Sequence, residues 1–96
     1  MNEVGAEIIV RGVVQGVGYR YFCHRHAVNL NLTGGVRNEP DGSVFVYVEG
    51  ARAAVEMLID ELKVGPSSAT VTQIKVKWMK YTGNYEDFDI TFRGYR

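Results

Sequence analysis

Two stretches of the chain alternate in hydrophobicity with a period of two, the pattern of a half-buried strand. They cover residues 43–49 and residues 70–80. The predicted inner faces are formed by Val44, Val46 and Val48 in the first stretch and by Ile74, Val76 and Trp78 in the second. Residues 6–13 are rich in β-branched side chains and predict a further strand. Short runs at residues 35–38 and 88–92 predict two more.

Two other stretches carry apolar side chains at helical spacing. Residues 20–30 predict one amphipathic helix, and residues 51–64 predict a second. The predicted core-facing positions are Phe22, Cys23, His26, Ala27 and Leu30 in the first helix and Ala54, Val55, Leu58 and Leu62 in the second. Asn31 tolerates the left-handed conformation that often follows a helix, and Gly65 followed by Pro66 is typical of a helix end.

The order of these elements predicts the fold. Strand, helix, strand, strand, helix and strand, with a short strand at the end, is the α+β arrangement called ferredoxin-like, in which two helices cover one face of a mostly antiparallel sheet. Residues 39–42 (Glu-Pro-Asp-Gly) predict the turn between the central strands. This fold carries many functions, so it does not assign one.

Composition narrows the class of protein. Residues 1–96 are expected to form a single domain. Eleven basic and eleven acidic residues leave no net charge, which argues against a nucleic-acid partner. A lone cysteine, Cys23, excludes an internal disulfide and suits a reducing cytoplasm. No signal peptide or membrane-length apolar stretch is present, so we expect a cytoplasmic monomer without a membrane partner.

The sequence Gly-Val-Val-Gln-Gly-Val-Gly-Tyr-Arg at residues 12–20 indicates an anion site. Its glycines allow several backbone N–H groups to point inward, and the start of the following helix adds further donors. Arg20 falls in the first helical turn, where the helix dipole disfavours a cation, so its presence favours a bound phosphate. Taken alone, such a loop could also be a tight connection. It is neither a Walker loop nor a dinucleotide-binding motif.

This loop, together with a second motif, resembles the acylphosphatases, small hydrolases of carboxyl-phosphate anhydrides. Residues 12–20 fit the pattern G-x-V-Q-G-V-x-(F/Y)-R of that family. Residues 34–50 fit its pattern G-(aromatic)-V-(K/R)-N-x-x-x-G-x-V-x5-G, except that Gly35 stands at the aromatic position. The resemblance extends to the closing segment, residues 83–90. We expect the glycine to lower stability unless a neighbouring side chain fills the space.

The resemblance implies an activity and a set of site residues. The expected reaction is metal-independent hydrolysis of an acyl phosphate to a carboxylate and inorganic phosphate, with phosphate also acting as an inhibitor and no cofactor involved. Arg20 would bind the phosphoryl oxygens and Asn38 would orient the attacking water. The backbone N–H groups that would surround the same oxygens belong to Gln15, Gly16, Val17, Gly18 and Tyr19. Because a carboxylate is a good leaving group, the chemistry needs no general acid.

Each of these residues also has a simpler interpretation. Arg20 could be a surface ion-pair partner, and Asn38 could be a turn residue before the proline at position 40. His24 and His26 are two positions apart on a helix and face different sides, so they do not form a metal site. We expect His24 to be exposed and His26 to be a core residue. Cys23 is expected to be a small buried apolar residue, not a nucleophile.

Two other functions remain open at this point. Phe45 and Tyr47 lie on the predicted open face of the sheet, where RNA-binding domains of this layout stack bases. Aromatic side chains can equally well pair across strands there, and zero net charge favours that interpretation. The chain could also be a non-catalytic binding module, or an acylphosphatase-like fragment of a larger protein that handles carbamoyl phosphate.

Overall fold

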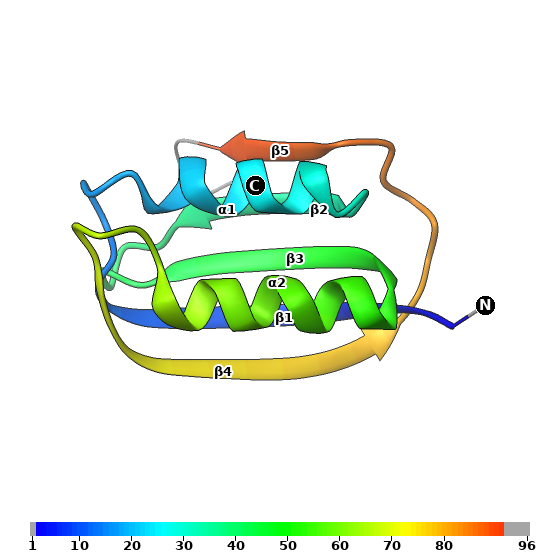
Figure 1. The fold of residues 1–96 in the computed structure, drawn as a ribbon. Helices are drawn as coiled ribbons and strands as arrows, with labels where there is room; N and C mark the ends of the chain where they lie inside the picture. Colours follow the sequence, from blue (N-terminus) through cyan, green and yellow to red (C-terminus); the bar gives the residue numbers. More distant parts are fainter. Residues whose placement is uncertain (1, 92–96) are drawn as a thin grey trace.

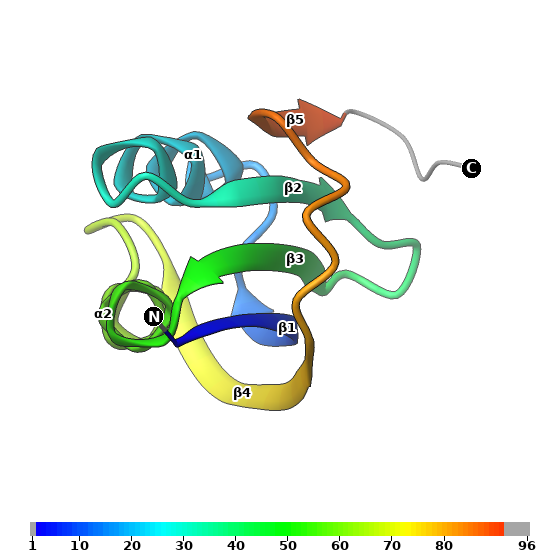
Figure 2. The ribbon, with the colours of Figure 1, turned by 90° about the vertical axis from the view of Figure 1, so that its right-hand side faces the viewer.

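The computed structural model describes residues 2–91 and contains two helices and five strands. In chain order these elements are β1 (Glu3–Val13), α1 (Tyr19–Asn29), β2 (Thr33–Asn38), β3 (Val44–Ala51), α2 (Arg52–Val64), β4 (Thr70–Lys80) and β5 (Phe88–Thr91), as Figure 1 shows. The sheet has the strand order β4-β1-β3-β2-β5. Of the four strand pairs among these residues, β2–β5 is parallel and the others are antiparallel. Both helices cover the same face of the sheet and leave the other face open (Figure 2). The predicted ferredoxin-like fold is confirmed.

The predicted boundaries differ from the observed ones by up to three residues. β1 starts at Glu3 and β2 at Thr33, each earlier than expected, because strand pairing with β3 continues past the apolar pattern. β5 is described as far as Thr91, so the predicted last residue of this strand, Phe92, lies outside the described residues. Asn31 has φ of 60° and Gly65 has φ of 72°, as expected for residues that follow a helix.

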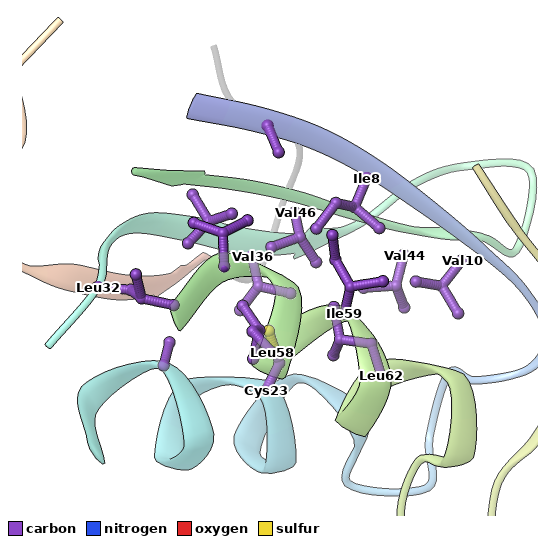
Figure 3. Packing of buried hydrophobic residues seen from close by; sticks show 14 of the residues in the cluster. Ile8, Val10, Cys23, Leu32, Val36, Val44, Val46, Leu58, Ile59 and Leu62 are labelled. Carbon is purple, nitrogen blue, oxygen red and sulfur yellow. The ribbon is translucent and has the colours of Figure 1, made fainter. Parts of the chain in front are cut away.

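The core lies between the helices and the sheet (Figure 3). The fully buried side chains from the strands include Ile8, Val10, Val44, Val46 and Val48, and those from the helices include Cys23, Ala27, Val55, Leu58 and Leu62. Trp78 faces the helix side as predicted but stays 38% exposed, because β4 is the edge strand of the sheet. The Arg52 guanidinium lies 4.1 Å from the centre of its ring. The buried Cys23 thiol has a raised pKa because burial disfavours the thiolate.

The two histidines of α1 are both partly buried. The ring of His26 lies 4.5 Å from that of Phe22, and its Nε2 lies 3.8 Å from a carboxylate oxygen of Glu61 at the surface. His24, which we expected to be exposed, lies against β5 with its ring 6.1 Å from that of Phe88. Within residues 2–91, no helix is long and apolar enough to cross a membrane.

Candidate active site

The loop between β1 and α1 turns on two glycines in the left-handed region. Gly16 has φ of 74° and Gly18 has φ of 79°. No atom of residues 2–91 lies within 4 Å of a Cβ added at either position, so the left-handed backbone conformation is what requires glycine. Gly18 is also the N-cap of α1 and offers no capping side chain. The N–H groups of the first helical turn, which have no acceptor within the helix, are therefore available to an external acceptor.

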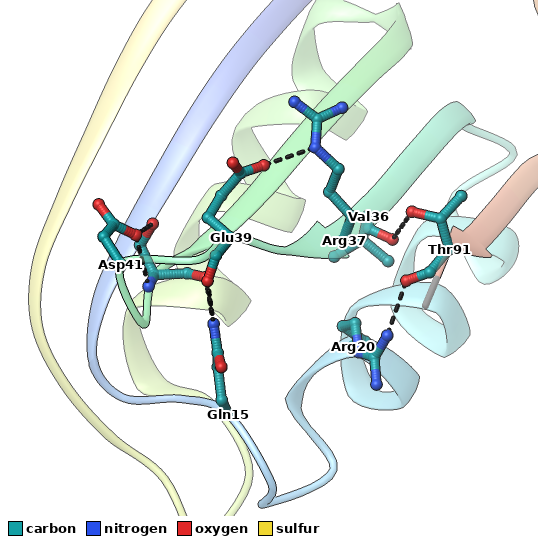
Figure 4. Close-up of polar contacts among 8 residues, drawn as sticks. Gln15, Arg20, Val36, Arg37, Glu39, Asp41 and Thr91 are labelled. Carbon is teal, nitrogen blue, oxygen red and sulfur yellow. Dashed lines mark hydrogen bonds and ion pairs between the residues drawn. The ribbon is translucent and has the colours of Figure 1, made fainter. Parts of the chain in front are cut away.

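The side chain of Gln15 fixes this loop to the turn between β2 and β3 (Figure 4). Its Nε2 donates to the carbonyl oxygens of Glu39 and Ser43, each at 2.8 Å. The turn is itself held by Asp41, whose carboxylate accepts hydrogen bonds from the Ser43 N–H at 3.0 Å and the Ser43 hydroxyl at 2.6 Å. Arg11 pairs with the same carboxylate at 3.0 Å. The loop is thus held beside the carboxyl end of β2, where Asn38 lies.

These contacts also set the charge of the turn. The two hydrogen bonds from Ser43, together with the guanidinium of Arg11, lower the pKa of Asp41 to about 2. Asp41 is therefore ionised at neutral pH, and its carboxylate forms an ion pair with Arg11.

Arg20 lies in the first turn of α1 and reaches the end of β5. Its Nη1 donates to the backbone carbonyl of Thr91 at 2.7 Å, and the Thr91 hydroxyl donates to the carbonyl of Val36 in β2 at 3.3 Å (Figure 4). The parallel pairing of β5 with β2 thus brings an acceptor to the guanidinium from a residue 71 positions away. This contact positions the guanidinium at the end of the sheet where Asn38 also lies.

Asn38 is the last residue of β2, and its Oδ1 is a buried acceptor that no donor in residues 2–91 reaches. Buried polar atoms in folded proteins nearly always have a partner, so an acceptor of this kind indicates a place for a water molecule or a ligand donor.

Arg20 and Asn38 line the same cavity, which has a volume of about 200 Å³. Its lining residues are Val14, Gly16, Gly18, Tyr19, Arg20, Tyr21, Asn38 and Ile90. It thus brings together most of the site residues predicted from the sequence. Gln15 and Val17 are the exceptions: they belong to the loop, but Gln15 contacts the β2–β3 turn and Val17 packs against the core.

The side chain of Tyr19 is a core residue. It is 1% exposed, and its hydroxyl donates to the carbonyl of Leu62 in α2 at 2.6 Å. Burial, with a smaller contribution from Cys23, raises the pKa of its phenol. Any role of Tyr19 in the cavity therefore belongs to its backbone N–H.

Sequence reasoning missed two supporting contacts of this site. The anchoring role of the Gln15 side chain was not predicted, although a long amide in a loop of glycines was a signal for it. The Thr91 carbonyl beside Arg20 had no local signal, because it depends on the pairing of β5 with β2. No group of three or more His, Cys, Asp or Glu side chains that could hold a metal occurs in the part of the chain that the structure describes.

Known proteins resemble this chain over most of its length. A model of the acylphosphatase family matches residues 6–90. The chain is 43% identical over 90 residues to an acylphosphatase of Chlorobaculum tepidum, covering 94% of this chain and 98% of that protein. It is 44% identical over 86 residues to an acylphosphatase of Thermotoga maritima, covering 90% and 94%. The chain therefore belongs to the acylphosphatase family, and it is an enzyme of the class that hydrolyses acyl phosphates.

Solved structures show the same relationship. The crystal structure of an acylphosphatase from Bacillus subtilis superposes with a TM-score of 0.89 at 35% identity and covers 92% of this chain and 98% of that one. A full-length HypF structure, solved in a phosphate- and nucleotide-bound form, contains a similar unit with a TM-score of 0.82 and 31% identity. That match covers 94% of this chain but only 12% of HypF. The unit thus occurs both in acylphosphatases of this length and inside a much larger protein.

Proposed function

We propose that the cavity between the 14–18 loop, Asn38 and Arg20 is the active site in which this acylphosphatase hydrolyses the carboxyl-phosphate bond. The observation that carries the proposal is that one guanidinium, one buried amide oxygen and a loop with two left-handed glycines line a single cavity of about 200 Å³. Positioning and electrostatic stabilisation dominate phosphoryl transfer, and these groups supply both.

Arg20 and the loop bind the phosphoryl group. A guanidinium can donate parallel hydrogen bonds to two oxygens of the dianion, and the bond to the Thr91 carbonyl fixes its orientation before the substrate arrives. The backbone N–H groups of residues 15–19 surround the same oxygens, and the positive end of the α1 dipole adds to the attraction. These interactions strengthen as negative charge accumulates on the oxygens in the transition state.

Asn38 orients the attacking water. Its Oδ1 accepts a hydrogen bond from the water, which turns an oxygen lone pair towards phosphorus. An amide is not a base at neutral pH, so the water proton passes to an oxygen of the phosphoryl group itself. As the new P–O bond forms, the bond to the acyl oxygen breaks and its electron pair leaves on the carboxylate. Because a carboxylate has a pKa near 4, no general acid is required, and the chemistry proceeds without a metal.

Substitution of Arg20 tests the proposal. With an aromatic acyl phosphate whose hydrolysis is followed by absorbance, Arg20→Ala should lose about 10²–10³ in kcat/KM, the usual effect of removing one transition-state donor. Arg25→Ala is the matched control, because Arg25 lies on the same helix, is exposed and is absent from the cavity lining. Activity should persist in a chelator. Near-normal activity of folded Arg20→Ala would disprove the assigned role.

Asn38→Ala separates the role of the water from phosphate binding. We expect kcat to fall by about 10² while KM for the substrate changes little, because the phosphoryl ligands remain. Inorganic phosphate should inhibit competitively and shift the amide resonances of residues 15–20 in both wild type and Asn38→Ala. If phosphate shifted the amide resonances of other residues instead, the proposed location of the site would be wrong.

Two further parts of the expected function stay predictions. The chain is expected to act as a monomer, which size-exclusion chromatography with light scattering would test. A cytoplasmic location is expected from the single cysteine, and fractionation of expressing cells would test it.

A further inference from the structure

A second hollow lies on the open face of the sheet, opposite the helices, and has a volume of about 240 Å³. Gly35 forms its floor, and the side chains around it are those of Arg37, Phe45, Tyr47, Tyr85 and Asp89. None of its lining residues lines the cavity that contains Arg20 and Asn38. The two hollows are therefore separate sites.

The hollow beside Gly35 exists because the side chain paired with it on β3 leans away from this glycine. Its partner across β3 is Tyr47, and its partner across β5 is Asp89. The Tyr47 ring leans instead towards β1, where its hydroxyl lies 2.8 Å from the place that a Cβ on Gly5 would occupy. Among the described residues, a Cβ added to Gly35 would meet only the carbonyl oxygen of Asp89, at 3.3 Å. The space expected at this glycine is thus not filled by the described residues.

The aromatic wall of the hollow is fixed by a buried carboxylate. The rings of Tyr47 and Tyr85 lie 5.3 Å apart, and the Tyr47 hydroxyl donates to Glu49 at 2.5 Å. Glu49 is 1% exposed and also accepts hydrogen bonds from Thr82 and from the Gly83 N–H, which fixes the segment that carries Tyr85. The wall is therefore in place before any ligand binds, which lowers the entropic cost of binding.

The other sides of the hollow carry opposite charges. The Arg37 guanidinium lies 4.5 Å from the centre of the Phe45 ring, and its Nε donates to Glu39 at 2.5 Å. On β5, Asp89 pairs with Gly35 and Thr91 pairs with Arg37. Arg37 and Asp89 both line the hollow. A floor of glycine backbone, an aromatic wall and one charge of each sign complement a molecule with a flat ring, an ammonium group and a carboxylate.

We propose that this hollow binds a free aromatic amino acid. The ring lies on the backbone of Gly35 beside the Tyr47–Tyr85 pair, the ammonium group pairs with Asp89, and the carboxylate faces Arg37. Aromatic rings favour such offset or edge contacts. A ligand of this size in an open, preformed hollow is expected to bind with a Kd on the order of 1 mM.

Titration of the ¹⁵N-labelled full chain with L-tryptophan tests the proposal, with indole and glycine as separate arms. Tryptophan should shift the amides of residues 34–37, 45–47 and 89–91 in a saturable way, indole should bind several-fold more weakly, and glycine should cause no such shifts. Absence of saturable shifts up to about 10 mM would overturn the proposal. Indole binding as tightly as tryptophan would disprove the role of the two charges.

Three variants locate the ligand. Gly35→Trp should fill the hollow and abolish tryptophan binding, and binding that persists would place the ligand elsewhere. Tyr85→Ala should weaken binding about tenfold. Tyr81→Ala should leave it unchanged, because Tyr81 is a similarly exposed tyrosine of the same segment that does not line the hollow. The comparison of Tyr85→Ala with Tyr81→Ala shows whether tryptophan binds in the hollow even if Gly35→Trp does not fold. Inorganic phosphate shifts at residues 15–20 report on the active site independently.

Discussion

Two connections of the fold, the loop before α1 and the segment before β5, are each fixed by one polar side chain, and the two side chains differ in charge. Gln15 donates from a neutral amide to two backbone carbonyls and holds the loop before α1. Glu49 accepts, as a carboxylate, from two backbone N–H groups and two hydroxyls and holds the segment before β5. The loop and this segment lie at opposite ends of the sheet (Figure 1).

The difference in charge between Gln15 and Glu49 fits the place of each side chain in the fold. A carboxylate at position 15 would stand beside a cavity proposed to bind a phosphate dianion and would repel it, whereas an amide fixes the loop without charge. Glu49 is at the far end of the sheet, where no such conflict arises, and hydrogen bonds to an ionised group are stronger than neutral ones. We infer that the lack of charge on the Gln15 side chain matters near the active site, and that the strength of the Glu49 hydrogen bonds matters at the far end of the sheet.

The largest expected effect is on stability and comes from Glu49→Gln. The change places an amide NH₂ where hydrogen-bond donors converge, so the free energy of unfolding should fall by about 2–4 kcal/mol. Glu56→Gln is the matched control, because Glu56 is exposed and pairs with Arg52 on its own helix, and it should cost at most about 0.5 kcal/mol. Urea unfolding measures both. Equal losses in the two variants would mean that the buried contact is no stronger than a surface pair.

Substitutions of Gln15 are expected to affect activity more than stability. Gln15→Ala removes two part-buried hydrogen bonds, so it should lower the free energy of unfolding by about 1 kcal/mol and raise KM about tenfold as the loop loses its anchor. Gln15→Glu should raise the inhibition constant of phosphate further, because it adds a like charge. Steady-state kinetics with phosphate as inhibitor measures this difference. Identical phosphate inhibition of the two variants would show that charge at position 15 does not matter.

The sequence predicted what depends on local pattern. The inward-facing valines of β3 and the left-handed Asn31 follow from alternation and from residue type, and the structure confirms both. The hydrogen bond from Arg20 to Thr91 and the contacts of Glu49 with Thr82 join residues 71 and 33 positions apart. Such contacts depend on strand order and on the path of a connection, which no local pattern encodes.

In the candidate site, too, some features were predictable from sequence motifs and others depend on contacts between distant residues. The glycine loop, Arg20 and Asn38 were predicted because a resemblance links two distant motifs, and the structure places Arg20 and Asn38 in one cavity. The sequence left open whether a neighbouring side chain fills the space at Gly35, and no side chain of residues 2–91 does so. The answer depends on the direction in which Tyr47 leans, and that direction is set by its hydrogen bond to Glu49.

The smallest expected effect is the change with pH in the stability that each contact contributes. This dependence on pH also distinguishes the Glu49 contact from the Gln15 contact most sharply. Burial by itself would raise the pKa of Glu49, but hydrogen bonds from Thr82, Tyr47 and Gly83 outweigh it and lower the pKa below its usual 4.5. A carboxyl whose pKa is lower in the folded state stabilises the fold above its unfolded pKa and loses that contribution as pH falls through the folded value. The stability difference between wild type and Glu49→Gln should therefore shrink below about pH 4.5.

The Gln15 contact contains no titrating group, so the difference between wild type and Gln15→Ala should stay constant over the same range. It should change only when Asp41, which holds the turn that Gln15 contacts, is protonated. The pKa of Asp41 is lowered from 3.8 to about 2, so that change belongs to the interval between these values. Urea unfolding of Glu49→Gln, Gln15→Ala and Asp41→Asn between pH 7 and pH 2 would measure the three curves. If the Gln15→Ala difference shrinks in parallel with that of Glu49→Gln from pH 4.5 downward, the two contacts are not independent and the contrast between them fails.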